Sequence, residues 1–347
     1  MQALRIHAHG GPEVLSLDSI PQPEPGAGEV LVRVLATSIN HLDLWVRRGM
    51  PGFPVGFPRI LGCDGIGEVA ELGSGVSGLE LGQRVLLEPG YTTQDSPELR
   101  AGMDHLAADY SVRGEHGDGF HAEYVVLSAQ YCLPLPANTN EISAESLAAV
   151  PLVYLTAWGM LMTRAKLQPG ECVLVLGGAS GVGSAAIQIA KDLGARVLAT
   201  AGSEAKRELA HSLGADEVID HRAENWGKEI KALTDGRGVD VVFEHVGPAT
   251  WRSSMGCLAR NGRLVTCGGT TGAKVELLLP HVFIKNLSIL GSTMGPKSAL
   301  PGIFQAVGEG RYRPVLDRAM PLSEAARAHE LLEAREVLGK LVLIPGQ

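Results

Sequence analysis

The sequence predicts a two-domain α/β protein in which a β-rich domain accompanies a six-stranded, doubly wound parallel sheet. In residues 1 to about 130, short apolar runs are separated by glycine and proline clusters and lack steady helical periodicity. From about residue 145, strand candidates recur roughly every 22 to 24 residues, and the first three intervals carry helical patterns. The 347 residues are enough for two full cores. We therefore expect one domain over residues 1–152 and 297–347, and the other over residues 153–296.

The first domain is expected to be built from short strands. Its clearest apolar runs lie at residues 30–35, 67–70, 84–87 and 123–126. The proline- and glycine-rich stretch 21–28 before the first of them predicts a turn-forming connector. Residues 91–116 are polar and irregular, so we expect them to form an excursion on the surface of this domain.

The second domain is expected to alternate strands with helices. A helical segment over 144–162 leads into strand candidates at 172–176, 196–200, 217–219, 239–243, 263–267 and 287–291. This alternation implies parallel pairing through right-handed crossovers, with strand order 3-2-1-4-5-6. Two further helices (298–309 and 323–334) and a last strand (340–344) are expected to return to the β-rich domain.

Composition excludes several function classes. The net charge of −8 provides no basic footprint for nucleic acid. We expect no apolar run to approach the roughly 20 residues of a membrane span, and we expect no signal peptide at the N-terminus. The five scattered cysteines lack a C-x-x-C pair, which argues against a disulfide framework. These features predict a cytoplasmic protein that binds neither nucleic acid nor membrane.

A glycine-rich turn follows the first strand of the second domain. The strand 172–176 leads through Gly177–Gly183 into a helix whose small and apolar residues recur at helical spacing. In a G-x-G-x-x-G frame the glycines are Gly178 and Gly183, whereas Ser180 takes the middle position. Such a turn brings backbone N–H groups and the positive end of a helix dipole to a pyrophosphate, although glycine turns also arise for packing. The predicted contact residues are Gly178, Ala179, Ser180, Gly181, Val182 and Gly183.

The carboxyl ends of the other strands supply further candidates. In a doubly wound sheet the ligand binds at this edge, and four of the strand ends here contain glycine. Packing alone accounts poorly for that repetition, so we expect a nucleotide ligand. The candidate residues are Ser203, Lys206, His221, Val246, Gly247, Gly268, Gly269, Thr270 and Ser292.

The choice of cofactor depends on the residues after the second strand. A carboxylate there would bind the ribose 2′-hydroxyl of NAD and repel a 2′-phosphate. Residues 199–203 carry no carboxylate at the strand end, and Ser203 and Lys206 can bind phosphate. These residues favour NADP(H). Lys206 and Arg207 can also be solvated charges on a helix, and Glu204 is a carboxylate one residue after Ser203. NAD(H) therefore remains the alternative cofactor.

Three stretches resemble the medium-chain dehydrogenase/reductase superfamily: residues 40–49, residues 61–69 and the glycine-rich turn. The resemblance covers essentially the whole chain and implies a GroES-like catalytic domain with a Rossmann domain. The first stretch is similar to the N-x-x-D-x-x-x-R-x-G pattern of zinc-free quinone oxidoreductases. Residues 40–43 and 61–65 also resemble certain bacterial alcohol dehydrogenase-like members.

The chain departs from the zinc-dependent members of that superfamily. The positions that align with their catalytic zinc ligands are Asn40, Cys63 and Leu152, with Asp64 in place of a glutamate. Asn and Leu do not supply the ligands that catalytic zinc requires. Cys63 and Asp64, with His41 nearby, leave a non-standard metal site as the alternative.

The structural zinc lobe of the superfamily also lacks its ligands here. Its four cysteine positions are occupied by Thr93, Ser96, Leu99 and Ala107. The length of the lobe is kept, so local packing must hold residues 91–110. We therefore expect no zinc at either site.

Three residues are candidates for the chemistry. Asn40 could hydrogen-bond a substrate carbonyl or the nicotinamide ribose, or act as a helix N-cap. Asp43 and Arg47 stand four residues apart on a predicted helix, which favours a plain salt bridge over a role at the site. Thr156 resembles a position near the nicotinamide, whereas a threonine within a helix can also bond its own backbone.

Four residues are candidates for lining a substrate pocket: His41, Trp45, Cys63 and Tyr154. Core packing would account for the aromatic side chains equally well. Cys63 could be a reactive thiol, although free cysteines are usually buried and inert.

The expected function is an NADPH-dependent oxidoreductase without catalytic zinc. Its acceptor would be a quinone or an α,β-unsaturated carbonyl, oriented in the cleft between the two domains. One alternative is an alcohol dehydrogenase that uses NAD(H) with an unusual metal or none. Another is a nucleotide-binding sensor or a structural protein, as zeta-crystallins are in this superfamily. The sheet edge at 287–291 and the resemblance predict a homodimer.

Overall fold

The protein was analysed as a computed structural model that describes residues 1–50 and 52–346. It divides into two compact units. The first unit comprises Met1–Leu152, Leu300–Glu309 and Pro314–Gln347. The second comprises Val153–Ala299 and Gly310–Arg313.

A six-stranded parallel sheet forms the centre of the second unit. Its spatial order is β13-β12-β11-β14-β15-β16, which is the predicted order 3-2-1-4-5-6. Val173 is aligned with Val197 on one side and Val241 on the other, so the first strand lies mid-sheet. The strands are β11 (Cys172–Val175), β12 (Arg196–Ala201), β13 (Glu217–Asp220), β14 (Val239–Glu244), β15 (Leu258–Thr266) and β16 (Ser288–Gly291).

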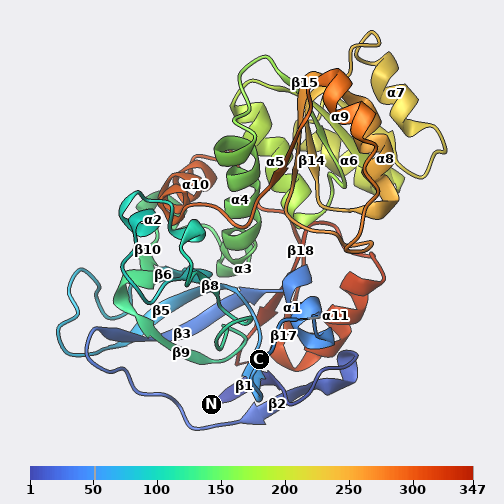
Figure 1. Cartoon of the computed structure of the whole chain (residues 1–347). Coiled ribbons are helices and arrows are strands. Elements are labelled where there is room, and N and C mark those ends of the chain that lie inside the picture. The colour runs from blue at the N-terminus through green and yellow to red at the C-terminus, as the bar shows by residue number, and fades with distance from the viewer. Residues whose placement is uncertain (51, 347) are drawn as a thin grey trace. The chain divides into compact units, whose positions relative to one another are not determined.

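Helices lie against this sheet (Figure 1), and the apolar side chains of its central strands are buried. The central strand β11 is a fully buried run, Cys-Val-Leu-Val, as expected where both faces of a parallel sheet are covered. Leu174, Leu198 and Val242 are completely buried within the resulting core. The helices are α4 (Pro151–Trp158), α5 (Gly181–Asp192), α6 (Glu204–Ser212), α7 (Trp226–Ala232), α8 (Pro248–Cys257) and α9 (Leu279–Lys285), and α4 continues into the π-helical turn η5 (Gly159–Arg164).

The first unit is built on largely antiparallel sheets. The order β10-β6-β5-β3-β18-β17, with β9 also paired to β3, forms the largest of them, and smaller sheets have the orders β2-β1-β4 and β7-β8. The strands are β1 (Gln2–Ile6), β2 (Leu15–Ser19), β3 (Glu29–Ser38), β4 (Arg59–Ile60), β5 (Asp64–Leu72), β6 (Arg84–Leu87), β7 (Gly90–Tyr91), β8 (Ser111–Val112), β9 (Tyr124–Ser128), β10 (Cys132–Pro134), β17 (Leu316–Pro321) and β18 (Lys340–Ile344). The C-terminal strand returns to this unit as predicted, because β18 pairs with β3 through Val342 and Ser38.

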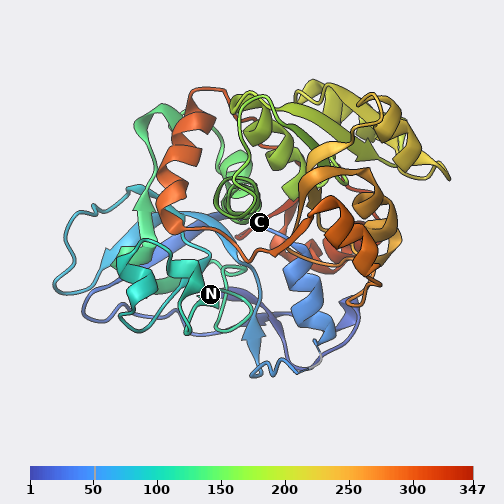
Figure 2. The same ribbon diagram turned by 45° about the horizontal axis from the view of Figure 1, so that its top comes forward.

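Short helices complete the first unit. Figure 2 shows α10 beside the segment that follows β10, in agreement with its contacts to residues 137–139. The α-helices are α1 (His41–Arg48), α2 (Pro97–Arg100), α3 (Ala144–Ala148), α10 (Leu300–Gly308) and α11 (Ala325–Glu333). The 3-10 turns are η1 (Pro12–Val14), η2 (Asp104–Leu106), η3 (Ala129–Tyr131), η4 (Ala137–Thr139), η6 (Lys297–Ala299) and η7 (Leu322–Glu324), of which η6 belongs to the second unit.

The predicted salt bridge between Asp43 and Arg47 was wrong. Arg47 instead reaches α11, where it pairs with Glu333 and lies 3.1 Å from His329 Nδ1, and its Nε donates to Gly10 O at 3.2 Å. The i, i+4 spacing allows an intrahelical pair, but a fully buried guanidinium gains more from several fixed acceptors. Arg47 therefore links α1 to α11 near the C-terminus.

Local hydrogen bonds hold the 91–110 lobe. Asp109 Oδ2 accepts from the backbone N–H of Thr93 at 2.5 Å and of Gln94 at 2.8 Å. These hydrogen bonds lower the pKa of Asp109, and the bond from Thr93 has the largest effect. Ser96 caps α2 by accepting from Leu99 N at 3.1 Å. Two of the former cysteine positions, Thr93 and Ser96, thus take part in hydrogen bonds that tie the lobe together.

One segment departs from the expectation that no apolar run would be long enough to cross a membrane. By length and composition Ala144–Arg164 is such a helix, with a mean hydropathy of 1.5. In the structure 72% of its most apolar window is buried within the protein, as in the core helix of a globular protein.

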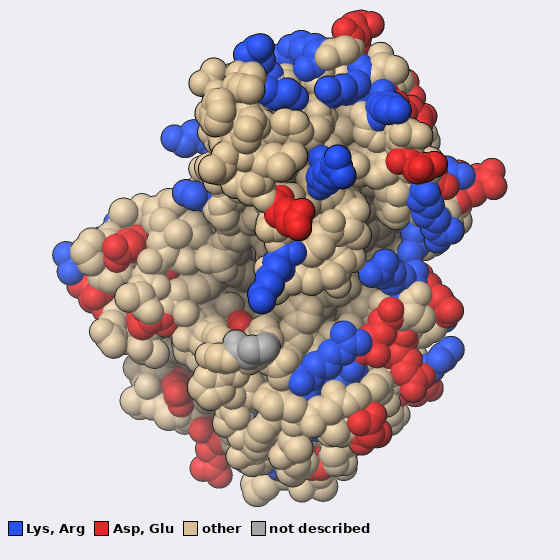
Figure 3. Space-filling view, turned by 45° about the vertical axis from the view of Figure 1, so that its right-hand side comes forward, with Lys and Arg blue, Asp and Glu red and all other residues tan. Residues whose placement is uncertain are grey.

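Charged side chains of both signs are interspersed on the face shown in Figure 3. Several Lys and Arg side chains gather in the upper part of this view, and most Asp and Glu side chains lie toward its right and lower parts. On this face, the described residues form no continuous basic stripe of the kind that tracks a nucleic-acid backbone.

Candidate functional site

The glycine-rich turn joins β11 to α5 in the second unit. Both glycines of the motif frame lie where a side chain would not fit. A Cβ on Gly183 would lie 2.3 Å from Gly177 O, and one on Gly178 would lie 2.9 Å from Ile187 Cδ1. Gly177 itself has a φ of 58°, in the left-handed region. The turn is therefore packed tightly against its own helix and strand.

Ser180 explains the departure from the G-x-G-x-x-G frame. It is the N-cap of α5, and its Oγ accepts from Gly183 N at 3.0 Å. The helix then begins at Gly181, and the first-turn N–H groups of Gly181 and Val182 have no acceptor within the helix. Ala179 is buried beneath them. This arrangement fits the phosphates of a dinucleotide, which require backbone donors at a helix N-terminus.

The end of β12 is bordered by polar and basic side chains. Ser203 caps α6, with Lys206 N donating to its Oγ at 3.4 Å. His221 contacts Thr200 Oγ1 at 3.2 Å through Nδ1. A Cβ on Gly202 would lie 3.0 Å from Arg222 Nε, which places this exposed guanidinium over the strand end.

Arg207 contributes less charge to this end than its sequence position suggests. Its Nη1 pairs with Asp220 Oδ2 at 3.1 Å. Arg222 was missed by the sequence analysis, although it follows the third strand, whose carboxyl end lies beside that of the second. The predicted parallel pairing of these two strands could have indicated that Arg222 lies near the end of β12.

A buried carboxylate shapes the end of β14. Glu244 accepts from the backbone N–H groups of Val246 at 2.7 Å and Gly247 at 3.0 Å. It also accepts from Thr250 Oγ1 at 2.9 Å and Ser254 Oγ at 2.7 Å. Glu244 was not among the predicted residues, yet it fixes the turn that contains two of them. Gly247 has a φ of 90°, which explains the glycine at that position.

The remaining candidates lie at the ends of β15 and β16. Thr270 N donates to His245 O at 3.3 Å, which ties residues 268–270 to the end of β14. A Cβ on Gly269 would lie 2.3 Å from Gly272 O, and Gly268 O accepts from Thr266 Oγ1 at 3.1 Å. Ser292 N donates to Thr266 O at 2.9 Å. The predicted residues thus gather along one edge of the sheet.

His245 stands beside the glycine-rich turn. Its Nε2 donates to Leu176 O at 2.8 Å, and a Cβ on Gly177 would lie 3.3 Å from its Cε1. Burial lowers the pKa of His245, so the neutral imidazole presents Nδ1 as an acceptor.

In the first unit, Asn40 is the centre of a buried polar cluster. Its Nδ2 donates to Asp64 Oδ2 at 2.8 Å and to Cys63 Sγ at 3.3 Å. Its Oδ1 accepts from the Lys340 ammonium, which also donates to Ile39 O at 2.8 Å. Lys340 was missed by the sequence analysis. The sequence showed only that Lys340 is the first residue of an apolar strand, and that this strand was expected to return to the β-rich domain.

Asp64 is saturated with hydrogen bonds. Ser38 Oγ donates to Oδ2 at 2.7 Å, and Lys340 Nζ lies 3.2 Å from the same oxygen. Leu152 N donates to Oδ1 at 2.7 Å. Each carboxylate oxygen therefore has at least one protein donor.

Asp43 fixes the start of α1. Its Oδ2 accepts from Asn40 N at 2.7 Å and its Oδ1 from Gly62 N at 2.8 Å, so Asn40 and Asp43 form a capping box. Burial raises the pKa of Asp43 to about 6, opposed by these two hydrogen bonds. Asp43 thus positions Asn40 and the backbone before Cys63.

Cys63 has the environment of an inert thiol. Burial, followed by the negative charges of Asp43 and Asp64, raises its pKa well above the ordinary value. His41 and Trp45 are half-buried on α1, with ring centroids 6.4 Å apart. Of the four pocket candidates, the two on α1 are therefore the more accessible.

Thr156 and Tyr154 lie on α4 in the second unit. Thr156 Oγ1 lies 3.8 Å from Met294 Sδ. Tyr154 is buried, donates to Arg313 O at 3.2 Å and accepts from Gln188 Nε2 at 2.9 Å. This position favours the core-packing interpretation of Tyr154.

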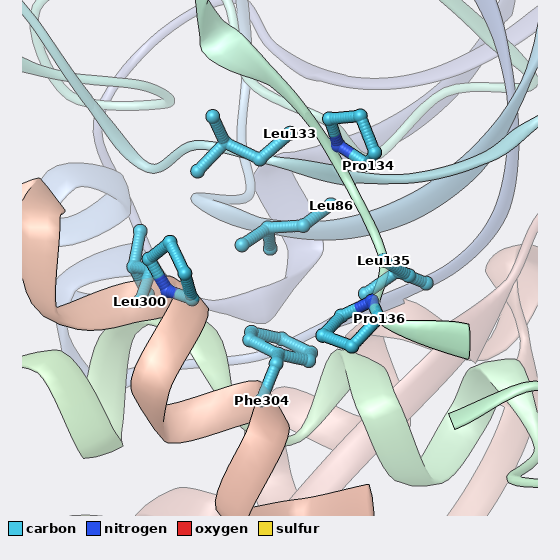
Figure 4. Close-up of a pocket in the computed structure, with 8 residues that line it drawn as sticks. Leu86, Leu133, Pro134, Leu135, Pro136, Leu300 and Phe304 are labelled. Carbon is cyan, nitrogen blue, oxygen red and sulfur yellow. The ribbon is translucent and has the colours of Figure 1, made fainter. Parts of the chain in front are cut away.

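An apolar cavity of about 20 Å³ lies between β6, the segment after β10 and α10 (Figure 4). Its volume is that of roughly one water molecule. All its lining residues are Leu, Pro or Phe: Leu86, Leu133, Pro134, Leu135, Pro136, Leu300, Pro301 and Phe304. It has neither the volume nor the polar groups of a substrate site.

Comparison with known proteins identifies the family. Residues 26–137 match the alcohol dehydrogenase GroES-like domain, and residues 181–309 match the zinc-binding dehydrogenase family. The quinone oxidoreductase of Pseudomonas aeruginosa is 34% identical, and the alignment covers 99% of each chain. The chain belongs to the medium-chain dehydrogenase/reductase superfamily.

Alcohol dehydrogenases of the superfamily also align with essentially the whole chain. An NAD-dependent alcohol dehydrogenase of Sulfurisphaera tokodaii is 30% identical over 99% of this chain and all of its own. A crystal structure of an NAD-dependent alcohol dehydrogenase is 45% identical, has a TM-score of 0.95 and covers all of both chains. The predicted family and fold are confirmed, and this medium-chain dehydrogenase/reductase is an NAD(P)H-dependent oxidoreductase.

The residues at the zinc positions of this superfamily do not fit catalytic zinc. Asn40 and Leu152 contribute an amide and an aliphatic side chain, and both oxygens of Asp64 already accept hydrogen bonds. Among residues 1–50 and 52–346, His, Cys, Asp and Glu form no group of three that could hold a metal ion. The donor set is instead an amide, a thiol and a carboxylate beside an ammonium.

Proposed function

We propose that this protein is an NADPH-dependent reductase of quinones or α,β-unsaturated carbonyl compounds that works without catalytic zinc. One observation carries the proposal. At the positions where zinc-dependent members hold their metal, this chain holds the hydrogen-bonded cluster of Asn40, Cys63, Asp64 and Lys340. This cluster contains hydrogen-bonding groups, among them the Asn40 amide and the Lys340 ammonium, in the place of a Lewis acid.

A conjugated acceptor suits such donors. When bound, the nicotinamide supplies a hydride, and the electron-poor carbon of the acceptor takes it. Negative charge then develops on the carbonyl oxygen, and a positioned N–H group stabilises it. A proton from solvent completes the reduction. Reduction of a simple ketone or oxidation of an alcohol normally needs a metal ion or a proton relay.

The end of β12 supports NADP(H) as the cofactor. Arg222 lies beside Gly202 at the strand end, and Ser203 and Lys206 follow at the start of α6, where NAD enzymes carry a carboxylate. These residues would hold a 2′-phosphate, and the turn at Ser180 would hold the pyrophosphate. The carboxylates nearby belong to Glu204, on the exposed side of α6, and Asp220, which Arg207 engages.

The second unit carries an exposed apolar surface that supports homodimer formation. It surrounds the edge strand β16, which has a hydrogen-bonded neighbour on one side only. The exposed residues on it are Val275, Leu277, Leu278, Leu279, Phe283, Ile284 and Ile289. We propose that a second copy of the chain covers them, because an apolar sheet edge pairs readily with its own symmetry mate.

The five cysteines support a reducing compartment. All five are free thiols in the structure. Cytoplasmic location remains the proposal that follows from them.

A second candidate function is NAD(H)-dependent alcohol oxidation. The 45% identity to an alcohol dehydrogenase structure favours it. It would require a metal bound by residues other than those aligned with the zinc ligands, or catalysis without one.

One experiment separates the two functions. The purified protein is titrated with NADPH and NADH by cofactor fluorescence, and turnover is then measured on a panel of quinones, enones and alcohols. The proposal expects at least tenfold tighter binding of NADPH and turnover of conjugated acceptors. Preference for NADH with turnover confined to alcohols would support the second candidate and reject the first.

A further inference from the structure

We propose that Lys340 is a positioning residue that holds the Asn40 amide and strengthens its N–H groups as donors to the carbonyl oxygen of the substrate. This inference rests on the proposed function, because it assigns a role within the same reduction. Lys340 stands 300 residues from Asn40 in the chain and reaches it from β18.

The surroundings of Lys340 fix its ammonium in one place. The Lys340 side chain is 5% exposed. Its three hydrogens are directed at Ile39 O, Asn40 Oδ1 and Asp64 Oδ2. An ammonium has three donors and no acceptor, so this set uses its full capacity.

The ammonium also fixes the orientation of the Asn40 amide. Because Lys340 only donates, the amide oxygen must face it, and Nδ2 must face the other side. There one N–H meets the Asp64 carboxylate at 2.8 Å, and the other meets Cys63 Sγ at 3.3 Å. Sulfur is a weak acceptor, so this second N–H is the one that we assign to the carbonyl oxygen of the substrate.

Lys340 also changes the strength of the amide as a donor. An amide whose oxygen accepts from a cation is polarised, and its N–H groups donate more strongly. Lys340 is the cation of this cluster. Burial and then the Lys340 charge lower the pKa of the neighbouring His121 to about 3, so that imidazole is neutral. The developing oxyanion would therefore receive a charge-assisted hydrogen bond through Asn40.

The test rests on a double variant that keeps the charge balance. Lys340→Met alone leaves the buried Asp64 carboxylate without its cation and risks unfolding. Lys340→Met/Asp64→Asn is therefore compared with Asp64→Asn and with wild type. Lys285→Met is the matched control, because this partly buried lysine in the second unit donates to Leu258 O at 2.6 Å.

Turnover is measured on a series of quinones and enones with substituents of increasing electron withdrawal. Removal of Lys340 should lower kcat by ten- to a hundredfold, leave the KM for NADPH unchanged and lower kcat most for the least electron-poor acceptors. It should have no further effect in an Asn40→Ala background. The side-chain amide protons of Asn40, followed by NMR, should move upfield in the variant without Lys340. Lys285→Met should change none of these quantities.

Two results would overturn the inference while leaving the proposed function intact. One is a uniform loss of kcat across the substituent series, which is what a purely structural role produces. The other is an additive effect of the Lys340 and Asn40 substitutions. A wild-type protein that reduces no member of the series would instead reject the proposed function, and with it the role of Asn40.

Discussion

Lys340 Nζ lies 3.2 Å from Asp64 Oδ2, and both side chains are almost completely buried. The pair joins the first residue of the last strand, β18, to the first residue of β5. Burying two charges costs desolvation free energy that the pair only partly recovers, whereas leaving one buried charge alone costs far more.

Loss of one partner should therefore be worse than loss of both. We expect Lys340→Met to lower the free energy of unfolding by about 3–5 kcal/mol, and Lys340→Met/Asp64→Asn to lower it by less. Urea denaturation of these two variants, of Asp64→Asn and of wild type gives the comparison. Equal or additive losses would show that the pair is not coupled.

The glycine-rich turn provides a second prediction. A Cβ at position 183 would lie 2.3 Å from Gly177 O, so Gly183→Ala should displace the turn and weaken cofactor binding at least tenfold. Gly256→Ala on α8 is the matched control, because a Cβ there meets no atom within 4 Å. Cofactor fluorescence titration measures both. Unchanged affinity in Gly183→Ala would remove the turn from the cofactor site.

Arg222 provides a test of cofactor choice. Arg222→Ala should raise the KM for NADPH about tenfold, since a charge-assisted hydrogen bond to phosphate is worth about 1.5–3 kcal/mol. The KM for NADH should stay within twofold of wild type. Arg207→Ala is the control, because Arg207 already pairs with Asp220. A loss shared equally by both cofactors would contradict the assignment of a 2′-phosphate site.

The apolar surface beside β16 provides a test of assembly. Phe283 is 65% exposed, and Phe283→Asp should convert the dimer to a monomer, because the interface would then bury an unpaired charge. Leu81→Asp, at a position that is 67% exposed in the first unit, should leave the dimer intact. Sedimentation equilibrium distinguishes the two species. A wild-type monomer, or a dimer that survives Phe283→Asp, would contradict the proposal.

The architecture of the second unit could be predicted because short segments of the sequence indicate its strands and helices. The strands contain short apolar runs such as 172–176, and parallel connections leave few topologies open. The strand ends then meet at one edge, which brought Ser180, Ser203 and Gly247 to the same side of the sheet. The role of Ser180 in the middle of the glycine motif could be assigned only when the start of α5 was known, because Ser180 caps that helix.

The polar cluster of the first unit could be predicted only in part. Asn40 was selected from its motif, but its partner Lys340 lies 300 residues away, and no periodicity links the two. The same limit explains the error at Arg47. Its spacing from Asp43 suggested a local pair, whereas the decisive acceptor, Glu333, comes from a helix near the C-terminus. Contacts across the chain decide such cases, and sequence spacing does not encode them.

The most direct test of the account measures zinc and turnover in the same sample. Protein purified without added metal is analysed for zinc, and NADPH-dependent reduction of an enone is measured before and after treatment with a chelator. The account predicts substoichiometric zinc and the same rate in both assays. One zinc per chain, with activity that the chelator removes and zinc restores, would contradict it.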